Sequence, residues 1–393
     1  MSILNGEERW ESFVLWAKSE GLKADGLVAS DFPDTGRGLK ALRDFNIGDI
    51  ILEVPGNIII TPDSILEKAC NPSNVKLSAH QSIALFVALE RRNLGRWKKY
   101  MDVLPQEFDT MPVLFSEKTM QWFPSYFQGE IARQRKKIKM DWKQAQDFVR
   151  TSGCNMPLFE DFLWGWLCVN TRCVYLDGHP LLQNPIGMAP FFDMLNHNHT
   201  AKIESEYDAK NDCFRIKTLT PYAQGDQVFI SYGAHDNAYI FLEYGYLPFD
   251  YNPYDSINVD ELFLNLRFEG EQDFRQKLEI LKAEGYLGDF TLRLDQVSYR
   301  LLVALRLRAM LRGEKEALWR DMLMGRRDII SVENEAKTKT YLREMCYELV
   351  KQADHVLASM GAISPWTARL EMIKRLWLEH KNVAEKVMKM KQL

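Results

Sequence analysis

The spacing of apolar residues divides the N-terminal part of the chain into a helix and a strand-rich stretch. Residues 7–20 predict a helix, because their large apolar side chains recur at intervals of three and four and Gly21 follows as a C-terminal stop. From Gly36 to Thr61 the apolar runs are short and predict strands. Gly48–Asp49 separates two of these runs and predicts a hairpin turn.

The next stretch, from about residue 64 to 170, is predicted to be helical. Three segments have apolar residues at helical spacing: 80–92, 129–153 and 159–172. Strand-like runs return between Pro185 and Tyr232, where "PIGMAPFFDMLNH" reads as an apolar strand, and Gly225–Asp226 marks a turn. The pattern therefore predicts a β-rich module that is split by a helical insert.

After Pro253 the chain is predicted to be helical to its end. Segments 298–311 and 334–361 carry apolar residues at i, i+3, i+4 and i+7. The last helix is expected to begin with Ser364 as its N-cap and Pro365 at its first position. Prolines and turn formers gather in "PFDYNPYDS", which places a domain boundary near residues 250–262.

Length and composition support a globular protein of two domains. The chain has 393 residues, of which 46% are apolar and 26% charged. A formal net charge of −4 argues against a protein that coats nucleic acid or a membrane. We therefore predict no direct nucleic-acid partner and no membrane partner.

Cysteines and the N-terminus indicate an intracellular protein. The six cysteines are scattered and form no CxxC pair, so they predict reduced thiols and no structural zinc site. The first 21 residues are charged and amphipathic and lack the apolar core of a signal peptide, and no stretch approaches ~18 uninterrupted apolar residues. We expect the protein in the cytoplasm and the nucleus.

Acid, amide and imidazole groups are concentrated in "DMLNHNHTAK" (Asp193–Lys202). A metal site would use Asp193, His197 and His199, but a catalytic metal wants its protein ligands on a rigid frame, and no HExxH helix or cysteine pair completes the set. A His-Asn-His nuclease would need a basic context, and the flanks are acidic or apolar. Taken alone, the residues favour a polar turn after an apolar strand.

Two further clusters are candidates for a binding site. "ISYGAHDNAYIFLEYGYL" (Ile230–Leu247) holds four tyrosines, and two of them precede glycines that let a ligand approach the backbone. Aromatic core packing explains any single tyrosine equally well. "DTGRGLKA" (Asp34–Ala41) contains a lone GxG that leads into no helix, so it fails as a dinucleotide fingerprint and predicts only a tight backbone beside a polar group.

Taken together and in order, these motifs resemble those of SET-domain methyltransferases. The ordered set is GRGL, then DMLNH, then SYG followed by EYGYL. The helical insert and "KKYMDVLPQEFDT" (Lys98–Thr110) resemble the subgroup typified by the Rubisco large-subunit methyltransferase, and the helical tail resembles its substrate-binding domain. The resemblance implies an α+β fold: a β-rich SET domain with a pseudoknot and a helical insert (iSET), followed by an all-helical C-terminal substrate-binding domain.

The resemblance also implies domain limits. The expected parts are an N-terminal helix at 1–24, the SET domain at 25–233 with its insert at about 64–170, a SET C-terminal flank at 234–260, and the helical domain at 261–390. No cysteine-rich segment follows the SET motifs, so the resemblance implies no zinc.

Roles in binding S-adenosyl-L-methionine follow from the same resemblance. Asn196 and His197 match the pair that binds this cofactor, and Arg172 matches an arginine that contacts it, with the cofactor carboxylate as the natural partner. Asp193 is expected to hold the Asn-His turn or the cofactor amine. The family's first cofactor-binding strand corresponds to the segment from Gly36 to Lys40, which includes Arg37, Gly38 and Leu39.

The tyrosines are assigned to the reaction itself. Tyr232 matches the active-site tyrosine, and Tyr244 and Tyr246 match positions that wall the cofactor and the lysine channel. An apolar aromatic channel suits methylation of lysine, because the amine must be neutral and such surroundings lower its pKa from ~10.4. No side chain stands out as a general base, and we expect the proton to leave through water.

The implied function is S-adenosylmethionine-dependent protein-lysine N-methylation by in-line SN2 transfer, with S-adenosyl-L-homocysteine as product. The protein or peptide substrate, with histones and non-histone proteins both candidates, is expected to bind between the SET and helical domains. One alternative is histidine methylation, which the small apolar residues Cys173 and Val174 after Arg172 suit less well. The other is a catalytically idle binding scaffold, although the residues that match the family's site are all present.

Overall fold

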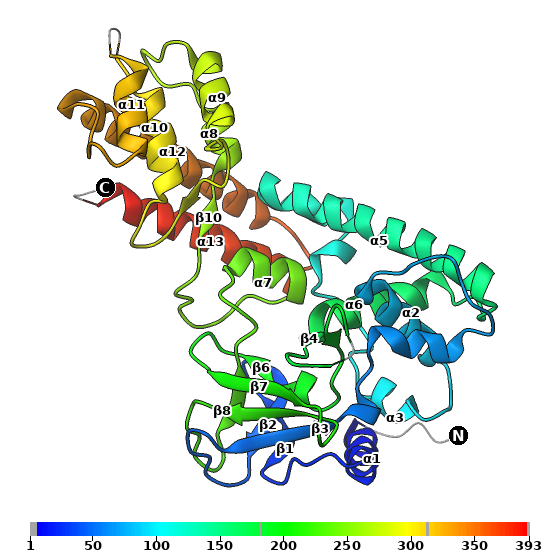
Figure 1. Ribbon diagram of the computed structural model, residues 1–393. Coiled ribbons are helices and arrows are strands. Elements are labelled where there is room, and N and C mark those ends of the chain that lie inside the picture. The colour runs from blue at the N-terminus through cyan, green and yellow to red at the C-terminus, as the bar shows by residue number, and fades with distance from the viewer. Residues whose placement is uncertain (1–5, 181, 312–313, 391–393) are drawn as a thin grey trace.

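The computed structural model describes residues 6–180, 182–311 and 314–390 (Figure 1). The strand-rich part lies at one end of the molecule and the C-terminal helices at the other, with α7 (Asn237–Tyr244) between them. No helix in these ranges is long and apolar enough to cross a membrane.

Two small sheets form the β-rich part. The four-stranded sheet has the order β1 (Leu27–Phe32), β2 (Gly36–Ala41), β9 (Gln227–Ile230), β6 (Asn196–His197). The three-stranded sheet has the order β3 (Ile50–Pro55), β8 (Cys213–Thr218), β7 (Ile203–Asp208). The strands of both sheets pair antiparallel except for β6 and β9, which run parallel. This pairing brings the DMLNH and SYG segments side by side, as the SET pseudoknot requires.

The predicted hairpin at Gly48–Asp49 is wrong. The chain does turn there, with the Asp49 N–H donating to the Asn46 carbonyl at 3.1 Å. The strands on either side, however, belong to different sheets, since β2 pairs with β9 and β3 with β8. A turn signal identifies a change of direction and says nothing about which strands then pair. The turn predicted at Gly225–Asp226 is confirmed, and it too connects strands of different sheets.

The apolar run before the Asn-His pair is not the expected strand. Two short parts of this run form strands. β5 (Ile186–Gly187) pairs with β4 (Val174–Tyr175), and β6 lies at the end of the run. Phe192–Met194 form a 3-10 turn, and Phe191 before it has a φ of 74°. This segment is buried in the core, and a continuous apolar run predicts burial without distinguishing strand from turn.

The helical insert packs against the sheets. Its helices, together with the N-terminal one, are α1 (Gly6–Ser19), α2 (Ala79–Glu90), α3 (Lys98–Met101), α4 (Glu117–Met120), α5 (Ser125–Ser152) and α6 (Phe159–Arg172). Its short 3-10 turns are η1 (Gly56–Ile58), η2 (Pro62–Lys68) and η3 (Pro112–Leu114). Gly165 lets α6 lie directly on α2, because a Cβ there would stand 2.5 Å from the Ala84 carbonyl oxygen. That contact fixes the direction in which α6 delivers Arg172.

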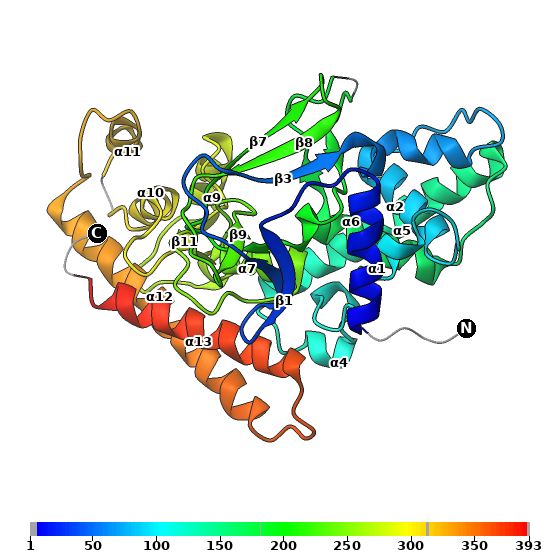
Figure 2. The same cartoon turned by 90° about the horizontal axis from the view of Figure 1, so that it is seen from below.

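The C-terminal part is helical apart from two short paired strands, β10 (Ile257–Asn258) and β11 (Thr291–Leu292). Its helices are α8 (Asp260–Asn265), α9 (Phe274–Ala283), α10 (Tyr299–Arg308), α11 (Glu316–Leu323), α12 (Val332–Met360) and α13 (Ala368–Met388). Helices α12 and α13 lie along each other (Figure 2). The last helix begins later than predicted, because Thr367 rather than Ser364 caps it and accepts the Leu370 N–H at 3.3 Å.

The apolar core has two parts. The first holds the sheets, α1, α2 and α6. The second joins the C-terminal helices to α7 and to the beginning of α5, where Phe241 stacks near Phe115, Phe123 and Phe127. Helix α7 therefore connects the site in the sheets to the C-terminal helices.

Candidate active site

The Asn-His pair and the SYG segment are held together by main-chain and side-chain hydrogen bonds. In the parallel pairing, Asn196 lies opposite Phe229 and His197 opposite Ile230. The Tyr232 N–H donates to Nδ1 of His197 at 3.0 Å, and the Asn198 N–H donates to the Ile230 carbonyl at 2.9 Å. Two motifs that are distant in sequence thus form one rigid corner.

Asn196 also contacts β2, the strand that was predicted from the sequence to bind the cofactor first along the chain. Its Nδ2 donates to the Arg37 carbonyl at 3.1 Å and approaches the Thr35 carbonyl at 3.4 Å. A Cβ at Gly38 would stand 2.7 Å from that nitrogen, so glycine is needed where the amide crosses the strand. All three motifs named in the sequence therefore meet here.

The remaining residues of the predicted strand divide between the surface and the core. Gly36 begins β2 with a φ of 68°, and the exposed Arg37 side chain pairs with Asp31 at 3.2 Å. Leu39 is fully buried in the core below the strand. The backbone, rather than these side chains, faces the site.

One cavity opens beside this corner, and we call it the Asn196 cavity. It has a volume of about 260 Å³. Its lining residues are Asp34, Thr35, Asn196, His197, Asn198, His199, Phe229, Tyr232, Tyr246, Pro248, Phe249 and Asp250. The Tyr246 hydroxyl is buried and has no partner in the structure, so the cavity contains a polar group that a ligand can satisfy.

A second cavity, the Arg172 cavity, lies on the other side of Tyr232. It has a volume of about 270 Å³ and walls of both apolar and polar side chains from α6, β4, the sheets and α7. Its lining residues are Thr171, Arg172, Cys173, Val174, Tyr175, Phe192, Asp193, Leu195, Ile203, Ser205, Phe214, Ile230, Ser231, Tyr232 and Tyr244. Among the described residues, Tyr232 alone lines both cavities.

Tyr232 is fixed on every side. Its hydroxyl donates to the Leu195 carbonyl at 2.8 Å, and its ring lies 4.9 Å from the Tyr244 ring and 5.2 Å from the His197 ring, measured between centroids. Burial raises the pKa of Tyr232 to about 12, and Arg172 opposes this only in part. The phenol therefore stays protonated at neutral pH and presents its remaining lone pair to the cavities.

His197 is held as a neutral acceptor. Burial, and after it the neighbouring His199 and His235, lowers its pKa to about 4. Because Nδ1 accepts the Tyr232 N–H, only Nε2 remains for a ligand. His199, expected to be an incidental turn residue, also lines the Asn196 cavity. In the described part of the chain, no group of three or more His, Cys, Asp or Glu is placed to hold a metal ion.

Arg172 lies at the Arg172 cavity and not at the Asn196 cavity, so the structure does not bring it together with Asn196 and Tyr246. Its Nη1 donates to the Asp193 carbonyl at 2.6 Å and lies 3.4 Å from the Asp193 carboxylate. Its Nε is buried without a partner. The expected contact with a cofactor remains a prediction.

Asp193 is the centre of a buried charge cluster. Burial raises the pKa of its carboxyl, while Arg172 and the Tyr100 hydroxyl, which donates at 2.9 Å, lower it. The carboxylate therefore orients Arg172 within the cavity wall, which both residues help to form, and holds the turn before Asn196. The sequence reasoning missed Tyr100, since the "KKYMD" segment carries no signal that it packs against residue 193.

The segment after Tyr246 was also missed as part of the site. Pro248, Phe249 and Asp250 line the Asn196 cavity. Arg375 of α13 secures them, with its Nη2 donating to the Pro248 carbonyl at 2.6 Å and its guanidinium carbon 4.8 Å from the Phe249 ring centroid. In the sequence these residues indicated only a domain boundary.

Comparison with known families identifies the class that this fold and site define. The chain belongs to the SET domain family, which matches residues 36–233, and residues 269–383 match the Rubisco LSMT substrate-binding family. The resemblance read from the motifs is therefore confirmed, as is the fold class.

Individual relatives cover nearly the whole chain. SET domain-containing protein 4 of Mus musculus is 28% identical over an alignment of 396 positions that covers 94% of this chain and 88% of the relative. The sequence segments "LEYGYLPFDYNP" and "VNTRCVYL" also resemble that protein in particular. A ribosomal lysine N-methyltransferase of Schizosaccharomyces pombe is 28% identical and covers 95% of this chain and 96% of the relative. An actin-histidine N-methyltransferase of Danio rerio is 26% identical and covers 88% of this chain and 61% of the relative.

Solved structures agree on the fold. The structure of Rubisco LSMT bound to sinefungin and monomethyllysine has a TM-score of 0.67 and 23% sequence identity, covering 97% of this chain and 90% of that one. The structure of Rubisco LSMT bound to AdoMet has a TM-score of 0.66 and 22% identity, covering the same shares of the two chains.

Proposed function

We propose that this protein is an S-adenosyl-L-methionine-dependent protein-lysine N-methyltransferase. The observation that carries the proposal is the position of Tyr232, which lines both the Asn196 cavity and the Arg172 cavity. A methyl donor in one cavity and an acceptor amine in the other would approach each other across a single fixed phenol. Alignment of this kind contributes ~7–11 kcal/mol to a bimolecular reaction.

The Asn196 cavity fits the cofactor. The Tyr246 hydroxyl and Nε2 of His197 are available for hydrogen bonds, and the Asp34 and Asp250 carboxylates can accept from hydroxyl or amine groups. Related Rubisco LSMT structures are described as bound to AdoMet and AdoHcy. When bound, S-adenosyl-L-methionine supplies a methyl group on a positively charged sulfur and leaves as S-adenosyl-L-homocysteine.

Tyr232 orients the reacting groups and does not act as a base. Its hydroxyl donates to the Leu195 carbonyl and its pKa is raised to about 12, so at neutral pH it stays protonated and its oxygen keeps a lone pair that can accept. That lone pair can accept a weak CH···O contact from a polarised methyl group or a hydrogen bond from an amine.

The Arg172 cavity suits the side chain of a substrate lysine. Cys173, Val174 and Tyr244 give it apolar and aromatic walls, which lower the pKa of an entering amine by disfavouring its charged form. The Asp193 side chain is fully buried, with Tyr100 and Arg172 both at Oδ2 and with Oδ1 unpartnered in the described chain, so it has no contact with solvent through which to pass on a proton. The proton is therefore expected to leave through water before an in-line SN2 transfer.

Histidine methylation is the competing assignment, because actin-histidine N-methyltransferases are among the relatives. The small, apolar Cys173 and Val174 favour an amine over an imidazole, which needs polar partners at both nitrogens. The test is methylation of a cell extract with isotope-labelled cofactor by wild type and by Tyr232→Phe, with the modified residues mapped by mass spectrometry. Label on lysine that depends on Tyr232 supports the proposal, and label on histidine alone would overturn it.

The substrate is proposed to be a protein that binds between the SET domain and the C-terminal helices, in the cytoplasm or the nucleus. Ribosomal proteins and histones are the first candidates, the former because a relative carries that name. An idle scaffold would bind no cofactor. Calorimetric titration with S-adenosyl-L-methionine that gave no heat would therefore move the assignment to a scaffold.

A further inference from the structure

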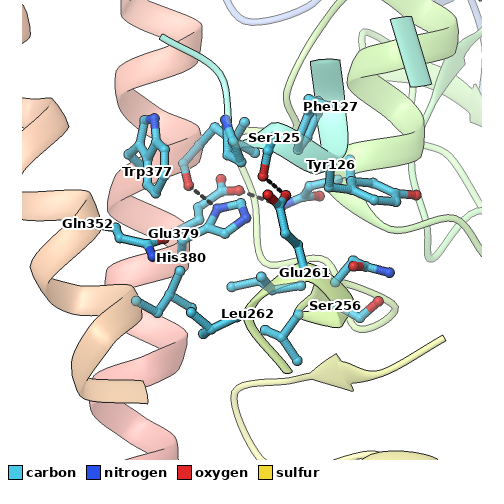
Figure 3. A pocket seen from close by; sticks show the side chains of 18 of the residues that line it. Ser125, Tyr126, Phe127, Ser256, Glu261, Leu262, Gln352, Trp377, Glu379 and His380 are labelled. Atoms are coloured by element: carbon cyan, nitrogen blue, oxygen red, sulfur yellow. Dashed lines mark hydrogen bonds between the residues drawn. The ribbon is translucent and has the colours of Figure 1, made fainter. Parts of the chain in front are cut away.

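A third hollow lies where the C-terminal helices meet α7 and the beginning of α5, and we call it the junction cavity (Figure 3). It has a volume of about 140 Å³ and shares no lining residue with the other two cavities. The residues that matter here are Asp255, Glu261, Glu379, His380, Trp377 and Tyr126.

Three carboxyl groups line the junction cavity, and their partners in the described chain are neutral. Asp255 accepts the Asn237 N–H at 3.0 Å, and Glu379 accepts from Nδ2 of the same asparagine at 3.2 Å. Glu261 is hydrogen-bonded to the Ser125 hydroxyl. Among the residues that the structure describes, no cation lies at hydrogen-bonding distance from these carboxylates.

Two of these carboxyl groups, which have no cation beside them in the described chain, have raised pKa values. Burial raises the pKa of Glu379 to about 7 and that of Asp255 to about 6; Asp255 raises the pKa of Glu379 further, and Asp236 that of Asp255. Arg375 lowers the pKa of Glu379, and Arg293 lowers that of Asp255, but each acts only from a distance. These two carboxyl groups therefore lose their protons near neutral pH, in a place where negative charge is costly, which is typical of a binding site.

His380 adds a further hydrogen-bond acceptor to the junction cavity. The residue is only 6% exposed, and its Nδ1 lies 2.7 Å from the Leu376 carbonyl, which can only accept. Nδ1 therefore carries the proton, and burial, which lowers the pKa of His380 to about 4, keeps the ring neutral. Its Nε2 is left as an acceptor with no partner in the described chain, and Figure 3 shows the ring beside Glu379 and Glu261.

The walls of the junction cavity favour an organic cation over a metal ion. Trp377 and Tyr126 bring aromatic surface to the same cavity, and a ring face attracts an ammonium or guanidinium group. Among the described residues, no cluster of three or more His, Cys, Asp or Glu is suited to a metal. Acceptors and rings together therefore suit a donor-rich organic group.

We propose that the junction cavity binds an ammonium or guanidinium group, supplied by a basic side chain of a protein or by a free small amine. Bound there, the cation neutralises Asp255 and Glu379 and fastens α13 to the first residue of α7, Asn237, which hydrogen-bonds to both carboxylates. This binding does not depend on the proposed methyl transfer.

Calorimetric titration of the full-length protein at pH 7.5 tests the proposal without any variant. The probes are N-acetyl-arginine amide, N-acetyl-lysine amide, agmatine and, as a neutral isostere, N-acetyl-citrulline amide. We expect at least one cationic probe to bind at least tenfold more tightly than the citrulline compound. Tighter binding of the amino-acid amides would indicate a protein side chain, and tighter binding of agmatine a free amine. Equal binding of charged and neutral probes, or no binding of any cation, overturns the proposal.

Isosteric variants then locate the site. Glu379→Gln combined with Asp255→Asn is expected to weaken binding of the cationic probe at least tenfold while circular dichroism stays unchanged. Glu385→Gln is the matched control, because Glu385 lies on the same helix, pairs with Lys381 at 4.0 Å and is outside the cavity. Binding that survives the double variant, or that Glu385→Gln weakens equally, contradicts this location.

Discussion

The Tyr232 N–H donates to Nδ1 of His197 at 3.0 Å, and this bond requires that nitrogen to be unprotonated. The bond joins the end of β9 to β6, and Tyr232 lines both cavities. The protonation state of one imidazole therefore determines whether the active-site corner keeps its shape.

Stability is expected to fall when His197 is protonated. Its pKa in the folded protein, about 4, lies below the usual 6.5, so the unfolded chain binds the proton more readily. The stabilisation is fully present above pH 6.5 and is lost as the pH falls toward 4. His80 and His380, whose pKa values burial also lowers to about 4, add to the same trend.

Urea unfolding at pH 7.5 and pH 5.0 measures this loss. His197→Asn keeps an acceptor near the Nδ1 position but does not titrate, so its stability should decrease less between the two pH values than that of wild type. His355→Asn, on the exposed surface of α12, is the control and should behave as wild type does. An unchanged pH dependence in His197→Asn would contradict the role given to this imidazole.

Local motifs allowed the site to be predicted, whereas long-range packing did not show in the sequence. Asn196, His197, Gly38 and Tyr232 were identified from short ordered motifs, and the structure brings them together. The partner strands of the Gly48–Asp49 turn were predicted wrongly, because pairing depends on residues far along the chain.

Other parts of the site depend on contacts that leave no local pattern. Tyr100 reaches Asp193 from the helical insert, and Arg375 reaches Pro248 from the last helix. The junction cavity gathers acids from separate segments in the same way. Burial of these polar groups follows from the tertiary fold, so neither periodicity nor composition could reveal them.

Tyr232→Phe tests the proposed orienting role. The variant loses the hydrogen bond to the Leu195 carbonyl, which costs about 1 kcal/mol of stability. Turnover is expected to fall roughly a hundredfold, the scale for removing one preorganised polar group, while the dissociation constant for S-adenosyl-L-methionine changes little. Steady-state methylation kinetics and calorimetry measure the two quantities.

Tyr222→Phe is the matched control for this variant. Its hydroxyl also donates to a backbone carbonyl, that of Phe229, at 3.1 Å, but Tyr222 lines neither cavity. It should lose at least as much stability, because the same hydroxyl also accepts the Phe229 N–H at 3.2 Å, and keep its turnover. If Tyr232→Phe turned over as fast as Tyr222→Phe, the orienting role would be wrong.

Asn196→Ala is expected to weaken cofactor binding. The substitution removes the donor that ties the Arg37 carbonyl to β6, and loss of one hydrogen bond at this exposed position costs about 0.5–1.5 kcal/mol, or roughly 2- to 13-fold in affinity. Calorimetric titration with S-adenosyl-L-homocysteine provides the measurement. Asn211→Ala, in the exposed turn between β7 and β8, serves as control, and an Asn196→Ala affinity equal to that of this control would count against the assignment.

Asp193→Asn should destabilise the protein. It leaves the partly buried guanidinium of Arg172 beside a neutral amide; removal of one partner of a buried ion pair costs about 3–5 kcal/mol, and relief of the burial that raises the pKa of Asp193 offsets part of this cost. Tyr100→Phe, which removes only a donor to the same carboxylate, should cost about 1–3 kcal/mol. Chemical unfolding at pH 7.5 ranks the two, and a smaller loss for Asp193→Asn than for Tyr100→Phe would show that Arg172 does not depend on this carboxylate.

Glu379→Gln is expected to stabilise the protein, and more so at high pH. The pKa of Glu379 in the folded protein, about 7, lies above its usual 4.5, so the folded state holds the proton more tightly. The resulting stability is complete below pH 4.5 and is lost as the pH rises through 7, by up to about 3 kcal/mol. Glutamine keeps an acceptor for Asn237 and carries no charge, so it avoids this loss.

The midpoint of thermal unfolding, measured at pH 5.5 and at pH 8.0, therefore shows whether the charge on Glu379 destabilises the protein. Glu379→Gln should raise the midpoint by several degrees at pH 8.0 and by less at pH 5.5, whereas Glu385→Gln should leave it unchanged at both. A cationic probe at saturating concentration should raise the wild-type midpoint at pH 8.0 and have no effect on Glu379→Gln combined with Asp255→Asn. If Glu379→Gln were less stable than wild type at pH 8.0, Glu379 would be a structural residue and not one held charged for a ligand.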